Sequence, residues 1–354
     1  PADDGPPPTG RLPIPAAAPR AADEARAAHP SSPGGETTPT SFPPSGSGTT
    51  MLDVSRTPSR LLAAVGAGGL LLTGCASADT GPDTSPNGLR ARLPEQLRKA
   101  GVLRIASDLN YAPVDFKGTD ASPAGLDPEL ATALGKYLGL RVQFVDMPFD
   151  KVIPAVQARE ADLAMSAVID TRQRQNGTDE YGRQTNPGVD FIDYFMTGTS
   201  ILVKAGNPLN IVNLDSLCGR TVAVQRGTIQ DELAQRQTAA CAKLAKPLQI
   251  HALDTDDKAL AEVAAGTAAA DLNDYPVAEY NTKSPDRGGK FQLAGGYLQP
   301  GPYGITLNKE STGLQYALSK ALDQLIRNGE YDKLLAKWNV QSGAVTSAVV
   351  NGGL

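Results

Sequence analysis

Apolar positions follow two alternating spacings along most of the chain. Short runs dominated by apolar and β-branched residues predict strands at 102–106, 141–145 and 162–166. Between them, apolar residues three or four positions apart predict helices, with Asp127 and Asp150 as their N-caps. This β-α-β-α-β order predicts a parallel sheet with helices on its faces.

The same rhythm restarts further along the chain. Strands are expected at 221–225, 248–252 and 269–273, with helices at 228–240 and from Thr255 or Asp256 onward. The sequence therefore predicts two α/β lobes. A strand at 303–307, a helix at 312–328 and a short helix at 331–338 follow. We expect this last part to return to the first lobe, with hinges near 198–202 and 298–302; one continuous sheet without hinges is the alternative.

A separate apolar run, residues 61–73, precedes the lobes and leads to Cys75. Upstream lie Met51, Arg56 and Arg60, so a short basic region, a short apolar core and a small-residue site ending in Cys are present. The tetrad Leu-Thr-Gly-Cys resembles the lipobox of bacterial lipoproteins, in which this Cys carries the lipid. The run is shorter than the roughly 20 apolar residues of a transmembrane helix. A buried helix with an incidental Cys is the other alternative.

These patterns divide the chain into segments. The first, residues 1–50, is rich in Pro, Ala, Gly and Ser and is expected to be disordered. It is either a genuine extension or translated sequence upstream of a start at Met51. The expected order is a signal peptide at 51–74, a lipidated Cys75 with a flexible linker to 92, lobe 1 at 93–198, lobe 2 at 199–300, a return to lobe 1 at 301–340, and a tail at 341–354.

Charge and residue counts exclude several classes of function. Beyond residue 75 the chain has 28 Lys and Arg against 32 Asp and Glu, so no basic surface for nucleic acid is expected. His251 is the one histidine outside the first 50 residues, which excludes a His-rich metal site; no metal or cofactor is predicted. The alternating pattern around His251 places it on the polar face of a strand. Cys218 and Cys241 are expected to form a disulfide in an exported protein, with two free buried thiols as the alternative.

Two charged groups follow predicted strands on different lobes. Arg174 comes shortly after the strand at 162–166, and Asp274 ends the strand at 269–273. Ligands of open α/β sheets bind beyond the carboxyl ends of the strands. A guanidinium can grip a carboxylate through two parallel hydrogen bonds, and a carboxylate can accept an ammonium. A zwitterion between the lobes would satisfy both groups.

In order along the chain, the motifs resemble family 3 solute-binding proteins of ABC importers, the amino-acid-binding group that includes glutamine-binding proteins. The resemblance covers about residues 93–340. It rests on segments 103–108, 111–116, 125–130, 148–156, 162–164 with 171–174, 189–191, 222–228 and 303–305. It implies the type II periplasmic-binding-protein-like fold, with two mostly parallel, helix-flanked sheets joined by two hinge strands. Residues 175–188 are expected to form an exposed loop inserted into this pattern.

The resemblance also implies a role for each site residue. Tyr111 and Phe149 would sandwich the ligand, Arg174 would hold its α-carboxylate and Asp274 its α-ammonium. Ser166 and Thr228 would add polar contacts, Ala167 is a further ligand-binding residue, and Asp108 would sense the ligand side chain. Simpler roles stay open: plain core aromatics for Tyr111 and Phe149, a solvated helix start for Arg174, a helix cap for Asp274, and bonds to loop amides for Asp108.

The implied function is a monomeric lipoprotein outside the cytoplasm, anchored to the cell membrane. It would capture a polar amino acid and deliver it to an ABC permease, without acting as an enzyme. A dehydratase on the same fold, using Asp108 and Asp274 as acid and base, is an alternative; an extracellular sensor is another. Asp108 suits a basic or amide ligand, whereas Arg226 would suit an acidic one if it pointed into the cleft. Gln225 stands where some family members have Lys.

Overall fold

A computed structural model of the chain describes residues 82–353. The predicted disordered segment 1–50, the signal peptide 51–74, Cys75 and the start of the linker lie outside the described residues. Within 82–353, no helix combines the length and the apolar character that crossing a membrane requires.

Lobe 1 contains a short parallel sheet with both faces covered. Strand β1 (Val102–Ser107) pairs in parallel with β5 (Arg141–Asp146) on one side and β6 (Leu163–Ala164) on the other. Alternate residues of β1 point to opposite faces: Ile105 joins the core under α3 and α9, and Ala106 joins the core under α4. The helices of this lobe are α1 (Pro86–Arg92), α2 (Glu95–Ala100), α3 (Leu126–Tyr137), α4 (Phe149–Gln157), α5 (Arg172–Asn176), α9 (Thr312–Arg327) and α10 (Glu330–Trp338).

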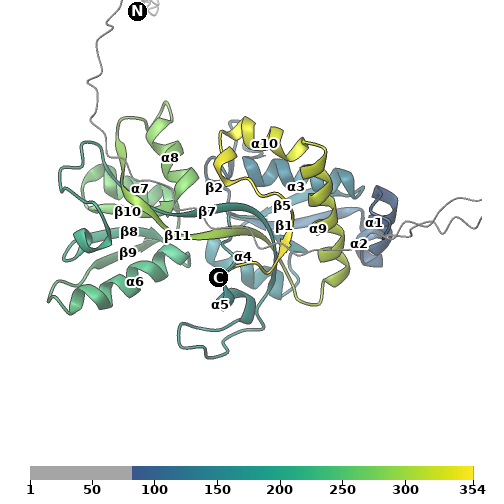
Figure 1. The fold of residues 1–354 in the computed structure, drawn as a ribbon, viewed down its shortest axis with the longest axis horizontal. Coiled ribbons are helices and arrows are strands. Elements are labelled where there is room, and N and C mark those ends of the chain that lie inside the picture. The colour runs from purple at the N-terminus through teal and green to yellow at the C-terminus, as the bar shows by residue number, and fades with distance from the viewer. Residues whose placement is uncertain (1–81, 354) are drawn as a thin grey trace, which may run out of the picture. The chain divides into compact units, whose positions relative to one another are not determined.

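Lobe 2 repeats this layering with its own core. Its strands β8 (Thr221–Gln225), β9 (Gln249–Leu253) and β10 (Ala270–Asp274) are all parallel. Val222 and Val224 pack with α6 on one face, and Ala223 packs with α7 on the other. The helical segments of the lobe are η1 (Leu214–Leu217), α6 (Ile229–Ala242), α7 (Asp256–Ala265) and α8 (Tyr275–Lys283). Figure 1 shows the two lobes side by side, with α6, α7 and α8 in one and α3, α9 and α10 in the other.

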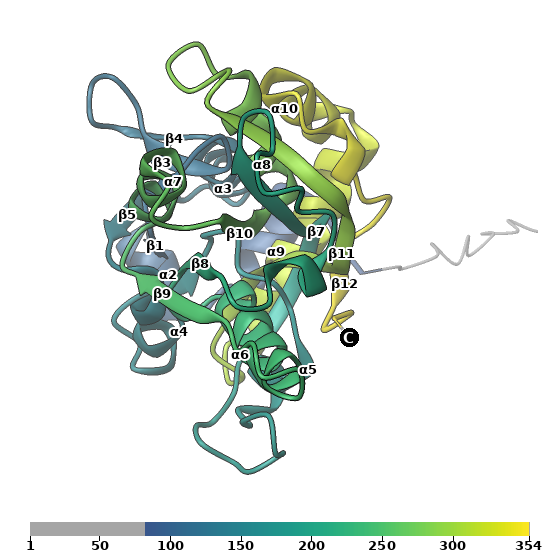
Figure 2. The same ribbon diagram turned by 90° about the vertical axis from the view of Figure 1, so that its left-hand side faces the viewer.

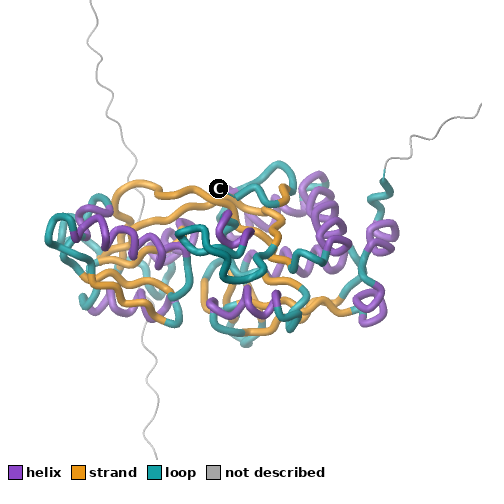
Figure 3. Tube along the Cα trace, turned by 90° about the horizontal axis from the view of Figure 1, so that it is seen from below, coloured by secondary structure: helices purple, strands orange, loops and turns teal. Residues whose placement is uncertain are grey.

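Two long antiparallel strands join the lobes. Strand β7 (Asp190–Lys204) and strand β11 (Phe291–Leu307) pair from Leu307–Asp190 in lobe 1 to Phe291–Lys204 in lobe 2. The register shifts between Ala294 and Gly301, close to the hinge positions expected from the sequence. Figure 3 shows both strands running along one side of the two lobes. Hydrogen bonding is therefore continuous in the order β5-β1-β6-β11-β7-β10-β8-β9, although each lobe has separate cores.

A small second sheet lies beside the main one. Strand β3 (Asp115–Lys117) pairs antiparallel with β2 (Asn110–Tyr111) and with β4 (Pro123–Ala124). Figure 2 shows β3 and β4 on the same side of the view as β5. This sheet follows β1 directly and carries Tyr111 toward lobe 2.

Four sequence predictions were wrong in detail. The expected flexible linker ends in helix α1, whose Leu89 is fully buried as α1 packs on α9. The expected C-terminal tail contains a 3-10 turn, η2 (Gln341–Gly343), and strand β12 (Val349–Val350), which pairs with β7. Neither Asp127 nor Asp150 is an N-cap, because α3 begins after Gly125 and α4 after Pro148.

The predicted disulfide is present in lobe 2. Cys218, just after η1, is bonded to Cys241 near the end of α6, with 5.3 Å between their Cα atoms. The bond ties the start of the lobe to the helix that covers one face of its sheet.

Candidate ligand-binding site

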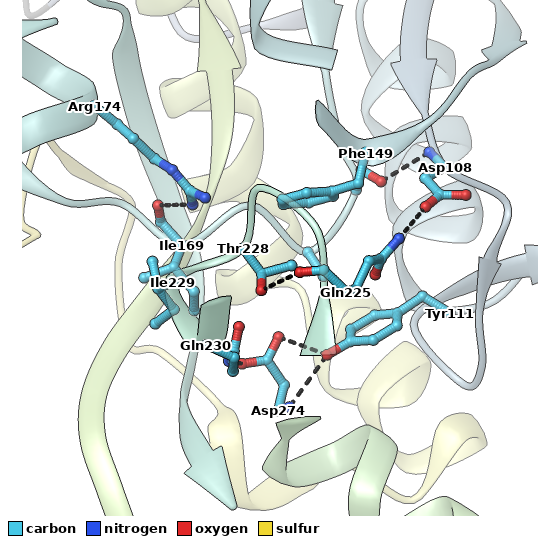
Figure 4. A pocket seen from close by; sticks show the side chains of 12 residues that line it. Asp108, Tyr111, Phe149, Ile169, Arg174, Gln225, Thr228, Ile229, Gln230 and Asp274 are labelled. Atoms are coloured by element: carbon cyan, nitrogen blue, oxygen red, sulfur yellow. Dashed lines mark hydrogen bonds between the residues drawn. The ribbon is translucent and has the colours of Figure 1, made fainter. Parts of the chain in front are cut away.

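A pocket between the lobes contains all eight residues that the sequence nominated for ligand binding. Figure 4 shows how their side chains converge from both lobes. Lobe 1 contributes Asp108, Tyr111, Phe149, Ser166, Ala167, Ile169 and Arg174, and lobe 2 contributes Gln225, Thr228, Ile229, Gln230 and Asp274. The cavity volume is about 10 Å³, close to the space one water needs, because the two sets of side chains meet.

Strand ends position five of these twelve residues. Asp108 follows β1, Ser166 and Ala167 follow β6, Gln225 ends β8, and Asp274 ends β10. The carboxyl ends of parallel strands meet at one edge of a sheet, and here the edges of both sheets face the same pocket. The sequence order of the elements thus accounts for the convergence.

Arg174 lies on the short helix α5, where the Thr171 hydroxyl caps the helix by accepting a hydrogen bond from the Arg174 backbone amide at 3.2 Å. The guanidinium donates to the carbonyl of Ile169 at 2.8 Å and, across the cleft, to the carbonyl of Gly227 at 3.1 Å. Its central carbon is 5.7 Å from the centroid of the Phe149 ring. These partners are uncharged, and no carboxylate among the described residues is bonded to the guanidinium.

Asp274 forms the main contact between the lobes together with Tyr111. The Tyr111 hydroxyl lies 3.0 Å from Asp274 Oδ2 and 2.5 Å from Asn273 Oδ1, and it accepts the Asp274 amide at 3.1 Å. Gln230 donates to Asp274 Oδ1 at 2.8 Å. Burial raises the pKa of Asp274 to about 6, with its hydrogen bonds to Tyr111 and Gln230 acting in the opposite direction.

Asp108 forms a second contact across the cleft. Its carboxylate accepts hydrogen bonds from Asn110 Nδ2 at 2.7 Å and from Gln225 Nε2, on lobe 2, at 2.5 Å. Burial raises the pKa of Asp108, the two amides lower it, and nearby Asp146 adds a smaller upward shift. No cation is bonded to this carboxylate within residues 82–353.

Four lining residues were not predicted as site residues: Ile169, Gln225, Ile229 and Gln230. A signal existed for Gln225, because it ends a predicted strand on the same edge as Asp274. Ile169 contributes its backbone carbonyl, which accepts a hydrogen bond from Arg174.

Two other predicted residues lie away from the pocket. Arg226 is exposed and donates to the carbonyl of Ala252, and it is not among the residues that line the pocket. A preference for an acidic ligand required Arg226 to point into the cleft, so Arg226 does not support such a ligand. His251 is exposed on β9 and lies 2.6 Å from Glu262, which agrees with a surface role.

Comparison with known proteins identifies the family. The family model "Bacterial extracellular solute-binding proteins, family 3" matches residues 103–341. The chain belongs to this family. The match spans both lobes and every pocket residue, so the type II periplasmic-binding-protein-like fold expected from the sequence is confirmed.

Among curated relatives of this solute-binding protein, the arginine-binding protein ArgT of Corynebacterium glutamicum is 28% identical over 76% of this chain and 84% of its own length. The lysine/arginine/ornithine-binding periplasmic protein of Escherichia coli is 28% identical over 70% of this chain and 89% of its own. A solved structure, an ancestral arginine-binding protein bound to arginine, covers 67% of this chain and 98% of its own with 29% identity and a TM-score of 0.60.

Proposed function

We propose that this solute-binding protein captures a free amino acid with a cationic side chain between its lobes and delivers it to an ABC permease. The observation that carries the proposal is the charge pattern of the pocket, in which one guanidinium faces two carboxylates. A zwitterion uses Arg174 and one carboxylate, which leaves one negative charge for a cationic side chain.

The three charged residues have distinct partners in this proposal. Arg174 holds the α-carboxylate in place of the backbone carbonyls that it now contacts, and Asp274 holds the α-ammonium. Asp108 receives the guanidinium or ammonium of the side chain. A buried carboxylate without a cation is costly, so a cationic ligand stabilises the closed pocket more than a neutral one.

Aromatic residues support the same assignment. Tyr111 and Phe149 enclose the apolar stem of the side chain, and the face of an aromatic ring attracts a cation. The relatives agree with this assignment. One curated relative is described as arginine-binding and another as lysine/arginine/ornithine-binding, and a related solved structure holds arginine.

Binding requires the lobes to separate, because the present cavity has no room for an amino acid. The ligand enters after the Gln225–Asp108 and Tyr111–Asp274 contacts break, and β7 and β11 flex. Closure on the ligand then replaces these contacts with charged ones. The free-energy difference between the empty closed form and the ligand-bound closed form favours the loaded state.

We propose binding without chemical conversion. Both pocket carboxylates are engaged by amide or hydroxyl donors that suit a holding role. One structural relative is an ancestral amino-acid-binding protein described as a precursor of cyclohexadienyl dehydratase, at 31% identity and a TM-score of 0.60. Mass spectrometry of amino acids incubated with the protein should return them unchanged; a dehydrated or decarboxylated product would contradict the proposal.

We also propose that Cys75 carries a lipid that anchors the monomeric protein to the outer side of the cell membrane. The support is the run 61–73 and the tetrad that ends at Cys75. Metabolic labelling with an alkyne fatty acid should mark the protein, and Cys75→Ser should abolish the label. Equal labelling of the variant would contradict the anchor.

The ligand class can be tested by thermal shift against arginine, lysine, ornithine, histidine, glutamine and glutamate. A ligand at about 100 times its Kd adds roughly 2.7 kcal/mol of stability. Arginine, lysine or ornithine should give the largest rise in Tm, glutamine a smaller one and glutamate none. The largest rise with glutamate would contradict the assignment of Asp108.

A further inference from the structure

The C-terminal segment 344–353 lies beyond the part of the chain that matches the family. It is anchored to three elements of lobe 1. Val349 and Val350 pair with Asp193 and Ile192 of β7, and the backbone amide of Ala348 donates to Asp323 of α9 at 2.9 Å. The Val345 amide donates to the Tyr331 hydroxyl of α10 at 3.1 Å. We call residues 344–353 the strap.

The strap ends on two buried carboxyl groups. The amide of Gly352 donates to Asp193 Oδ2 at 3.0 Å, and the amide of Gly353 donates to Asp170 Oδ2 at 2.8 Å. Asp170 is 1% exposed and Asp193 is 4% exposed. Asp193 Oδ1 is buried with no donor among the described residues. Two carboxyl groups so placed need these amides, since buried polar groups without partners are costly.

Asp170 connects the strap to the ligand pocket. Its side chain also accepts a hydrogen bond from Gln175 of α5 at 2.8 Å, and its backbone amide donates to the carbonyl of Pro302 of β11 at 2.8 Å. The preceding residue, Ile169, lends its carbonyl to Arg174. The turn that presents Arg174 is thus held between the crossing strand β11 and the strap.

We propose that the strap positions this turn, and that amino-acid affinity depends on Gly352 and Gly353 staying bonded to Asp193 and Asp170. The proposal rests on the proposed function of Arg174 as the carboxylate-binding residue. With the strap displaced, residues 168–174 sample other conformations, and only the fraction with Arg174 in place binds ligand. If that fraction falls to about a tenth, the apparent Kd rises about tenfold.

A substitution at Gly353 can displace the strap specifically. A Cβ atom on Gly353 would lie 2.3 Å from the backbone oxygen of Asp170, which cannot move aside without moving the turn. Gly353→Ala should therefore dislodge the strap. The matched control is Gly118→Ala, just after β3, where no positive φ is required and the nearest atom to an added Cβ belongs to the exposed Asp120 side chain, at 3.3 Å.

The protonation state of the Asp170–Asp193 pair offers a second, independent way to perturb the strap. Burial and the neighbouring Asp170 raise the pKa of Asp193 to about 7, so this carboxyl group is mostly protonated below that pH and mostly ionised above it. The charged groups around the pair and the strap are Asp170, Arg174 of α5, Asp190 of β7 bonded to Asn351, and Asp323 of α9. Because the folded pKa is raised, the stability due to this proton is lost as pH rises through about 7. Asp193→Asn keeps a neutral side chain at every pH.

The experiment measures amide hydrogen exchange of residues 167–176 in the ligand-free protein, and arginine affinity by calorimetry, at pH 6 and pH 8. Gly353→Ala should speed exchange in 167–176 and weaken affinity about tenfold. Gly118→Ala should match wild type. Wild type should exchange faster at pH 8 than Asp193→Asn after correction for intrinsic rates.

Unchanged exchange and affinity in Gly353→Ala, or equal effects in Gly118→Ala, would contradict the proposed positioning role of the strap. So would a lower Tm of Gly353→Ala with the same Kd and the same exchange at 167–176, which marks a purely structural role. If wild type binds no amino acid, the proposed function fails, and the exchange comparison still decides whether the strap holds the turn.

Discussion

At the scale of single residues, the pocket brings together charged groups that form no ion pair within residues 82–353. Arg174 is bonded to carbonyls, and Asp108 and Asp274 to amides and a hydroxyl. Such weak neutral partners can be exchanged for the charged groups of an amino acid with a net gain. The contacts of the closed pocket therefore also describe what a ligand must replace.

Asp108 should determine the preference for a cationic side chain. Asp108→Asn keeps the shape and removes the charge, so arginine affinity should fall by roughly 1.5–3 kcal/mol, or about 10- to 150-fold. Glutamine affinity should change by less than about threefold, since an amide can bond to Asn. Calorimetry with both ligands measures the difference. Equal losses for arginine and glutamine would count against this role.

Asp274 should make binding depend on pH. Its pKa of about 6 in the free protein means that it holds a proton below that pH, and the ligand ammonium favours the ionised form. Affinity should therefore fall by up to about tenfold per pH unit below 6, with proton release on binding. Calorimetry at pH 5 and pH 7, in buffers of different ionisation enthalpy, measures both. A flat profile between these values would contradict the assignment.

Part of the site followed from the sequence alone. Arg174 and Asp274 could be placed because each comes at or soon after the end of a strand. Gln225 ends a predicted strand, but its contact with Asp108 depends on how the two lobes close. Gln230 bonds to Asp274 within lobe 2 from helix α6, a position that strand order does not single out. Ile169 contributes through its backbone carbonyl, which no side-chain pattern reveals.

At the scale of elements, local signals predicted most of the helices and strands. Thr255 caps α7 through the Lys258 amide, as its position before an apolar pattern indicated. Helix α1 and strand β12 were missed because each is short and is stabilised by distant partners, α9 and β7. Asp127 was misassigned because its carboxylate is used elsewhere, accepting the Ala167 amide at 2.9 Å and the Tyr194 hydroxyl.

The disulfide stabilises lobe 2 in particular. Cys218→Ala/Cys241→Ala removes a link across 23 positions of sequence, and the chain-entropy relation gives a loss of roughly 3 kcal/mol. Urea denaturation followed by circular dichroism measures the change. Arginine affinity at low temperature should persist, because neither cysteine lines the pocket. Unchanged stability of the double variant would refute the assigned role.

At the scale of the whole described molecule, contacts through Tyr111 hold the lobes together without ligand. Tyr111→Phe removes the hydroxyl that reaches Asn273 and Asp274, so the ligand-free variant should populate an open form. Small-angle X-ray scattering should give a larger radius of gyration than wild type without arginine, and the same value with it. Tyr181→Phe, on an exposed loop, is the control. Identical scattering of both variants would contradict this account.

The central claim is that an amino acid binds between the lobes with its carboxylate on Arg174. Titration of arginine into wild type and Arg174→Ala by calorimetry tests it most directly, with circular dichroism to confirm that both are folded. The account predicts saturable binding to wild type and a loss of more than about 100-fold in the variant, since two charge-assisted bonds are removed. Unchanged affinity in a folded Arg174→Ala protein would contradict it.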